Sequence, residues 1–389
     1  PIKSSAASDV YKRQKVPNST AEQLWKFMET DLTEAITSGK LTSKTSLEDR
    51  DGGTRATLEA ARCLLGKIYL YQEKYADAKS ELEKVISSGK YDLIADVSTF
   101  YHPASAGCKE YVLECVRHYG PSNMYSQEGW FGILANWGFG YGFIAGPEAS
   151  MHYKFNTTSG YSYFNPSKSL YDAFVAEEGA DGYRLNAWIR TWEQVIAMNI
   201  AVNTTTNKYA SEGYFRLKWL ASTDDEFVGY WCGNQSNTPV IRYADVLLMA
   251  AEACLQAGDQ AGADEYLGRV RDRARLPRKS HVTLSDIKLE RRLELAMEGM
   301  RFQDLKRWGD APAVLADKGK KLPTFQIVPD PNNDLTTAAG IYNARYTTKT
   351  TYVDNEKSLA GWTPNRDEWL PFPENELEVN SNLKQNPGY

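Results

Sequence analysis

The segment Trp137-Gly-Phe-Gly-Tyr-Gly-Phe143 alternates aromatic residues and glycine without interruption. In an extended strand, residues two apart share a face, so the four rings would lie on one side of the chain and bare backbone on the other. The flat C–H faces of sugars pack on aromatic rings, and nearby amide side chains can bind sugar hydroxyls. The segment therefore predicts either a carbohydrate-stacking surface or an aromatic ladder in a core, where the glycines admit a neighbouring chain.

Further aromatic residues of this region lie beside amide side chains. The stretch from Tyr119 to Trp231 holds 25 of the 47 aromatic residues of the chain. Any one of them alone is more typical of packing, but several in polar, glycine-containing loops favour a ring that faces a ligand. We predict stacking by Trp130, Trp137, Tyr141, Tyr163 and Trp231, and hydroxyl binding by Asn136, Asn234 and Gln235. We assign Trp188, Trp192 and Trp308, which lie in helical patterns, to packing.

Arrangements typical of catalysis are missing from the sequence. It has no G-x-S-x-G, H-E-x-x-H or Walker pattern, and its four histidines lie far apart. A glycoside hydrolase needs only two carboxylates, but the acidic run Asp224–Glu226 is more typical of a solvated turn. The spacing of Asp330, Asn332 and Asp334 resembles a calcium loop but lacks its glycine and its closing glutamate, so we predict an Asx turn. We expect no enzyme, no cofactor and no bound metal.

Composition narrows the class of protein further. The formal charge of -5 argues against nucleic acid as a partner, because nucleic-acid-binding proteins usually carry a concentrated basic face. The five cysteines are odd in number and without C-x-x-C spacing, which signals neither a disulfide framework nor a zinc site. We expect buried thiols at Cys63, Cys108, Cys115, Cys232 and Cys254.

Two helix pairs must position the aromatic region. Residues 57–72 and 74–87 carry apolar residues at the three-and-four spacing of amphipathic helices, and the small residues Gly66 and Ala78 match the tetratricopeptide pattern. Residues 244–255 and 261–273 repeat this signal. The sequence therefore predicts a helical repeat layer that is interrupted by a large insertion.

Other segments give weaker signals. We predict helices at residues 167–176, about 182–198 and 285–308, and irregular structure after Pro312 that ends in an extended, proline-containing strap. The alternating glutamates and arginines from Glu290 to Arg307 predict a salt-bridged helix face of the scaffold, or alternatively a surface for a partner.

Three ordered motifs, together with the first helix pair, carry a resemblance to a known family. They are PVIRYADVLLMAAEA at 239–253, LERRLELAMEGMRFQDLKRW at 289–308 and LKQNPGY at 383–389. With these motifs the chain resembles the SusD/RagB family, the cell-surface glycan-binding lipoproteins of Bacteroidetes, over most of its length from about Ala21.

The resemblance implies both a fold and a setting. The fold class is mainly α: tetratricopeptide-like helix pairs form a scaffold that carries a large irregular insertion of loops and short strands. The partners implied are a glycan, a SusC-like TonB-dependent transporter and the outer membrane, where members are surface-exposed lipoproteins. The family is not enzymatic, and its motifs transfer no sugar-binding residue.

The chain departs from the family at its N-terminus. Members carry a lipoprotein signal with an acylated cysteine and a further helical region, and the sequence begins instead with PIKSSAASDVYKRQ, which reads as foreign. We therefore expect a truncated member whose lipid anchor is absent from this chain.

The predicted organisation is one SusD-like unit with five parts. These are a non-native tag (1–14), an N-terminal helical part (15–108), the aromatic-rich ligand-binding insertion (109–240), a C-terminal helical part (241–310) and an irregular strap (311–389). The leading hypothesis is a non-catalytic glycan-binding component of an uptake complex. The alternatives are a glycoside hydrolase and a tetratricopeptide-type adaptor that binds only protein.

Overall fold

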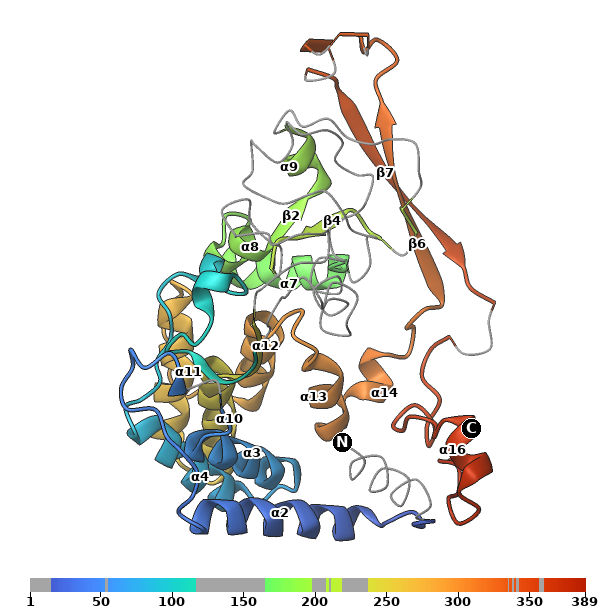
Figure 1. Cartoon of the computed structure of the whole chain (residues 1–389). Helices are drawn as coiled ribbons and strands as arrows, with labels where there is room; N and C mark the ends of the chain where they lie inside the picture. The colour runs from blue at the N-terminus through green and yellow to red at the C-terminus, as the bar shows by residue number, and fades with distance from the viewer. Residues whose placement is uncertain are drawn as a thin grey trace, which may run out of the picture. The chain divides into compact units, whose positions relative to one another are not determined.

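The computed structural model describes residues 15–52, 55–116, 165–197, 208–209, 211–218, 237–334, 336–337, 339–340, 343–356 and 360–389 (Figure 1). The chain divides into two compact units. One consists of Pro1–Asp31, Phe302–Lys321 and Asn355–Tyr389, and the other of Leu32–Arg301 and Leu322–Asp354. The five-part division expected from the sequence stays a prediction.

The first predicted helix pair is present as α3 (Leu58–Tyr71) and α4 (Tyr75–Ser87). Thr57 caps α3 by accepting a hydrogen bond from the backbone N–H of Ala60 at 3.1 Å. A Cβ atom on Gly66 would lie 2.8 Å from Cγ of Leu82, so the glycine lets α4 approach α3 closely. This confirms the role predicted for small residues in the helix pair.

The second pair is α10 (Tyr243–Gln256) and α11 (Gln260–Arg273), and α12 (Leu284–Glu294) follows it. Every residue of α10 from Tyr243 to Cys254 is buried, as expected for a helix surrounded by others. One hydrophobic cluster contains side chains of α3, α4, α10, α11 and α12, so both predicted pairs share a core (Figure 1). The predicted fold class, a mainly α scaffold of tetratricopeptide-like pairs, is confirmed.

Two predicted helices are broken in the structure. The segment 285–308 ends as a helix at Glu294 and resumes as α13 (Arg301–Arg307), since Met297 and Gly299 between them have φ of 65° and 79°. The segment 182–198 forms α8 (Tyr183–Trp188), strand β2 (Ile189–Thr191) and α9 (Trp192–Ala197). The apolar spacing of the segment continues through β2, which instead pairs antiparallel with β4 (Tyr214–Arg216).

The prediction of irregular structure after Pro312 was partly wrong. Strands β6 (Lys321–Pro329) and β7 (Tyr346–Asp354) form a sheet with β3 (Lys208–Tyr209), in the order β3-β6-β7. Short helices α14 (Ala311–Val314) and α16 (Glu374–Val379) flank this hairpin in sequence. The β-branched and aromatic residues of β7 favour a strand. The prolines elsewhere in this region favoured the prediction of irregular structure.

An N-terminal helix was not predicted. This helix, α2 (Ala21–Thr37), has no buried residue. Among the described residues, no helix combines the length and the apolar character needed to cross a lipid bilayer.

Asp330 and Asp334 accept hydrogen bonds from the backbone N–H groups of Asn332 (2.8 Å) and Thr336 (2.9 Å), which confirms Asx turns. Trp188 and Trp192 are buried, as the packing assignment requires.

The four described cysteines carry free thiols. Cys63 and Cys254 are buried as expected, whereas Cys108 is partly exposed and Cys115 is exposed, so the prediction of burial was wrong for the latter. Cys232 lies outside the described residues.

Gly66→Ala tests the close contact of α3 and α4. We expect a loss of about 1–3 kcal/mol in the free energy of unfolding, because the added methyl group clashes with Leu82. Gly268→Ala in α11 is the matched control, since its Cβ would meet only the flexible side chain of Arg278. There the better helix propensity of alanine should stabilise by up to about 1 kcal/mol. Urea denaturation measures both, and equal effects at the two glycines would contradict the packing argument.

Candidate functional site

All eight residues predicted to contact a glycan lie outside the described residues. Trp130, Asn136, Trp137, Tyr141 and Tyr163 belong to residues 117–164, and Trp231, Asn234 and Gln235 belong to residues 219–236. Their assignment therefore stays a prediction. The same holds for the acidic run 224–226. What the structure describes is the frame to which these segments are attached.

The first part of this frame is a strand pair that closes the base of the insertion. Strand β1 (Tyr111–Cys115) pairs antiparallel with β5 (Thr238–Arg242), so Cys115 lies opposite Thr238. The chain thus leaves the helical scaffold and returns to it at one place. Asn237 strengthens the closure by donating a hydrogen bond to Glu114 at 2.9 Å.

The second part consists of α7 (Lys168–Glu178), α8 and the β2–β4 pair. Their apolar side chains form a second hydrophobic cluster around Phe174, Leu185 and Trp188. The indole of Trp188 donates a hydrogen bond to the carbonyl oxygen of Val97 at 3.1 Å, which ties α8 to the N-terminal helical part.

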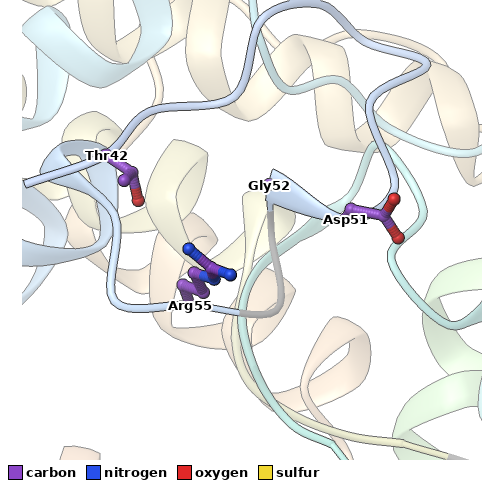
Figure 2. Close-up of a pocket in the computed structure, with 4 residues that line it drawn as sticks. All are labelled: Thr42, Asp51, Gly52 and Arg55. Atoms are coloured by element: carbon purple, nitrogen blue, oxygen red, sulfur yellow. The ribbon is translucent and has the colours of Figure 1, made fainter.

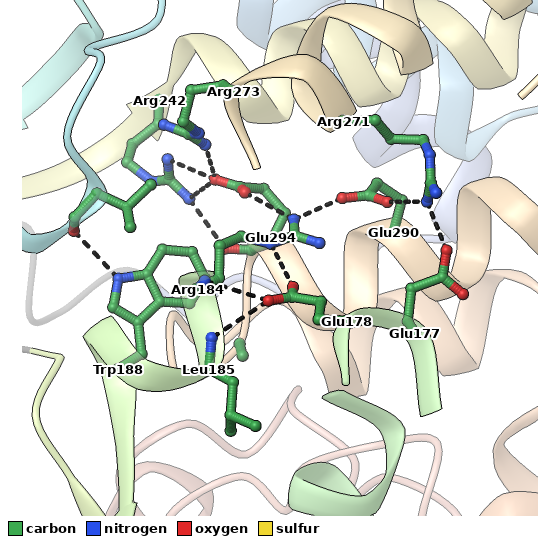
Figure 3. Close-up of polar contacts among 12 residues, drawn as sticks. Glu177, Glu178, Arg184, Leu185, Trp188, Arg242, Arg271, Arg273, Glu290 and Glu294 are labelled. Carbon is green, nitrogen blue, oxygen red and sulfur yellow. Dashed lines mark hydrogen bonds and ion pairs between the residues drawn. The ribbon is translucent and has the colours of Figure 1, made fainter. Parts of the chain in front are cut away.

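A buried ion network joins this frame to the repeat helices (Figure 3). Glu294, the last residue of α12, is 0% exposed and is surrounded by three guanidinium groups. Arg184 of α8 lies 3.0 Å from its carboxylate and Arg242 of β5 lies 3.1 Å away. Arg273 of α11 is the third partner. One carboxylate thus connects α12, α11, β5 and α8.

Further carboxylates extend the network on one side of Glu294. Glu178 pairs with Arg184 at 2.7 Å, and Glu290 pairs with Arg271 at 3.1 Å. Arg271 also contacts Glu177 at 2.6 Å. Because Glu177 and Glu178 end α7, these pairs hold that helix against α11 and α12 (Figure 3).

On the other side, the network reaches the base of the insertion. Glu110, just before β1, pairs with Arg242 at 2.6 Å and with Arg273 at 3.2 Å. Glu298 pairs with Arg242 at 2.6 Å and with Lys218, which follows β4, at 2.5 Å. The strand pair and β4 are therefore fixed to the helical scaffold by charge as well as by packing.

The charges of the network nearly cancel. Five cations face six carboxylates, and Lys279 adds a sixth cation 3.2 Å from Glu177. Such near neutrality is required, because a buried charge without a partner costs several kcal/mol. The five cations are Arg184, Lys218, Arg242, Arg271 and Arg273, and the carboxylates are Glu110, Glu177, Glu178, Glu290, Glu294 and Glu298.

The pKa values follow from this arrangement. Burial opposes ionisation of Glu294, but Arg273, Arg242 and Arg184 outweigh it and hold the pKa of Glu294 well below its usual range. Burial raises the pKa of Glu110 despite its two arginine partners. Burial also lowers the pKa of Lys218 to about 8, although Glu298 opposes that shift.

The network agrees with the salt-bridged scaffold face predicted for the charges between Glu290 and Arg307, and it shows that several of these charges are buried. Glu290, Arg291 and Glu294 are buried, and Arg291 pairs with Asp245 of α10 at 2.8 Å. Spacing along a helix shows which residues share a face but not whether that face meets solvent. The arginine residues that complete the network come from three other elements.

One hollow of about 500 Å³ lies elsewhere in the described residues (Figure 2). Its described lining residues are Thr42, Asp51, Gly52 and Arg55. Figure 2 shows the Arg55 side chain between Thr42 and Gly52. These four described residues offer hydrogen bonds, and none of them has an aromatic ring.

A group of possible metal ligands also has another explanation. Glu83, Cys254 and Asp259 lie within 4.8 Å of one another. The ammonium group of Lys79 already lies 2.7 Å from Asp259 and 3.9 Å from Glu83. Burial raises the pKa of the Cys254 thiol to about 12, which disfavours the thiolate that a metal would need. We interpret the group as an ion pair between helices.

Comparison with known proteins identifies the family. The model of the SusD family matches residues 109–389, which is well over half of the chain. This chain belongs to the SusD family. The match contains the Arg242, Glu290, Glu294 and Glu298 positions of the ion network. The resemblance drawn from the three sequence motifs is thereby confirmed.

Curated SusD relatives match parts of the chain. A SusD-like protein of Bacteroides ovatus is 31% identical over 170 residues, which are 39% of this chain and 29% of that protein. SusD-like protein P2 of Formosa agariphila is 32% identical over 194 residues, 45% of this chain and 29% of that protein. The aligned segments thus span less than a third of these relatives.

Solved SusD structures match nearly the whole chain. A laminarin-binding SusD-like protein superposes with a TM-score of 0.70 at 28% identity, covering 95% of this chain and 70% of that one. Surface glycan-binding protein A of Bacteroides fluxus gives a TM-score of 0.71 at 24% identity, covering 96% and 71%. The second match supports the fold alone. The names of these proteins describe binding, and none of them names an enzyme.

Glu294→Gln tests the centre of the network. We expect a loss of about 3–5 kcal/mol in the free energy of unfolding, because three buried guanidinium groups lose their shared negative charge. Glu265→Gln is the control, since its pair with Arg278 is about half exposed and is expected to contribute less than about 1 kcal/mol. Both are measured by urea denaturation at neutral pH. Similar losses for the two variants would contradict a central role for Glu294.

The contribution of Glu294 should also depend on pH. Since its folded pKa is lower than the ordinary value of 4.5, the unfolded chain takes up the proton first. The difference in stability between wild type and Glu294→Gln should therefore be constant above about pH 5.5. It should shrink by about 1.4 kcal/mol on reaching about pH 3.5. A difference that does not change between these pH values would show that Glu294 is not held ionised.

Proposed function

We propose that this SusD-family chain is a glycan-binding component of an outer-membrane uptake complex and that it performs no chemistry on its ligand. One observation carries the proposal: the laminarin-binding SusD-like protein is 28% identical and covers 95% of the chain. A neighbour at that level over nearly the full chain supports a related ligand class. Laminarin is accordingly the first glycan to test.

The geometry of the frame suits binding without catalysis. Both ends of the insertion are held at one place by β1 and β5, and the ion network fixes α7, α8 and β4 to the repeat helices. A rigid base reduces the conformational entropy that is lost when a ligand binds to side chains attached to it. The predicted rings Trp130, Trp137 and Trp231 would then supply the stacking surfaces.

A glycoside hydrolase is less well supported. Such an enzyme needs two carboxyl groups that face each other across the sugar. The buried carboxylates of the network are instead paired with arginine or lysine, so these groups serve the scaffold. A protein-binding adaptor would require the aromatic residues of the insertion to be packed inside it. Glycan titration distinguishes both alternatives from the proposal.

The transporter and the membrane belong to the same proposal. Membership of the SusD family supports a SusC-like TonB-dependent transporter as the partner and a lipid-anchored position on the cell surface. The helical scaffold offers a broad rigid surface for such a partner, whereas the loops of the insertion can differ with the glycan.

Replacement of the predicted stacking residues tests the glycan site. We expect Trp137→Ala and Trp231→Ala each to weaken laminarin binding by about 10-fold or more, because a buried aromatic contact is typically the dominant one in an interface. Trp369→Ala is the control, since this tryptophan is 49% exposed but lies outside the insertion. Isothermal titration calorimetry measures the affinity, and chromatography of the same samples detects released sugar.

Three results would argue against the proposal or part of it. Release of sugar would overturn the non-catalytic assignment. Binding that survives both tryptophan replacements would remove these residues from the site. Failure of the wild-type chain to bind laminarin or any member of a wider glycan panel would overturn the glycan-binding function itself.

A further inference from the structure

Three tyrosines from distant parts of the sequence meet beside the frame of the insertion. They are Tyr171 of α7, Tyr214 of β4 and Tyr352 of β7. The rings of Tyr171 and Tyr214 stack with centroids 4.6 Å apart and planes at 28°. Both also pack at the edge of the second hydrophobic cluster, so they form a supported aromatic base. The sequence analysis named none of the three as a binding residue.

Tyr352 differs from the other two because 49% of it is exposed. Its hydroxyl donates a hydrogen bond to one carboxylate oxygen of Glu212 at 2.8 Å. The other oxygen of Glu212 accepts the backbone N–H of Lys168, at the start of α7, at 2.5 Å. Glu212, which lies two residues before Tyr214, therefore joins β7 to α7. An exposed ring is held in one orientation at this point.

Polar side chains suited to sugar hydroxyls are linked to this ring through Glu212 and Lys168. Asp172 and Lys168 form an ion pair at 2.7 Å, and both side chains are more than half exposed. Glu212, which accepts the hydrogen bond of the Tyr352 hydroxyl, is a second carboxylate beside Asp172 in this set. On the same face of β7 as Tyr352, Thr348 bonds to Glu193 of α9. Carboxylates accept hydrogen bonds from hydroxyls, and ammonium groups donate to them.

These features combine the two elements of carbohydrate recognition. An aromatic face packs against the C–H face of a sugar, and charged groups at its border fix the hydroxyls. A ring that is already held by a hydrogen bond loses less conformational entropy on binding than a free one. In the sequence, Lys168 follows the predicted stacking residue Tyr163 by five residues.

We propose that Tyr352 forms a second glycan-contact surface, in which one neutral sugar ring packs on the exposed tyrosine while Asp172, Glu212 and Lys168 bind its hydroxyls. Glu212 links this surface to the Tyr171–Tyr214 stack, because Glu212 lies two residues before Tyr214 in the chain. The inference rests on the proposed glycan-binding function and extends it to residues outside segments 117–164 and 219–236.

Titration of the full chain with laminarin tests this surface. We expect Tyr352→Ala to weaken binding by about five-fold or more, because the ring is lost. Tyr352→Phe should retain most of the affinity, since it keeps the ring and loses only the bond to Glu212. Val353→Ala is the matched control: it is the next residue of β7, is 61% exposed and points to the opposite face of the strand.

The outcomes separate this inference from the proposed function. Wild-type affinity in Tyr352→Ala, with binding lost in Trp137→Ala, would overturn the second surface and leave the glycan function intact. Equal losses in Tyr352→Ala and Val353→Ala would also overturn it, because the effect would then come from the strand as a whole. Failure of the wild-type chain to bind laminarin would overturn the inference together with laminarin as the ligand, while the wider panel would still test glycan binding.

Discussion

The burial of Glu294 among three arginines is the constraint on which the rest of the larger unit depends. A carboxylate removed from water is stable only when cations surround it, and here they come from α8, β5 and α11. These elements must therefore meet at the end of α12 in one arrangement. An apolar contact of similar size would tolerate rotation or sliding, whereas directed guanidinium–carboxylate bonds specify position.

This constraint gives a physical meaning to the motifs by which the family is identified. Arg242 lies in the motif at 239–253, and Glu290, Glu294 and Glu298 lie in the motif at 289–308. In the fold these residues are partners, and they close the base of the insertion against the helix pairs. The motifs thus belong to the scaffold, which is why they do not indicate any sugar-binding residue.

A binding role suits such a division between a fixed base and the segments attached to it. The two helix pairs share one apolar core. The ion network fixes β1, α7 and β4 to these helices. Catalysis would need ionisable groups that are free to exchange protons with a substrate. The buried charges of this frame are held by one another instead.

The sequence by itself determined the helix pairs, the family and the aromatic-rich composition between Tyr119 and Trp231, because apolar spacing, motifs and composition are local properties. It predicted Thr57 to Gln72 almost to the residue, since a capping threonine and a regular apolar stripe need no distant partner. Only the tertiary structure decided that Glu290 and Glu294 are buried and that residues 189–191 form a strand. It alone placed Tyr352 beside Tyr214. Each of these depends on residues far away in the chain, and helical or strand spacing carries no information about which distant element will lie opposite.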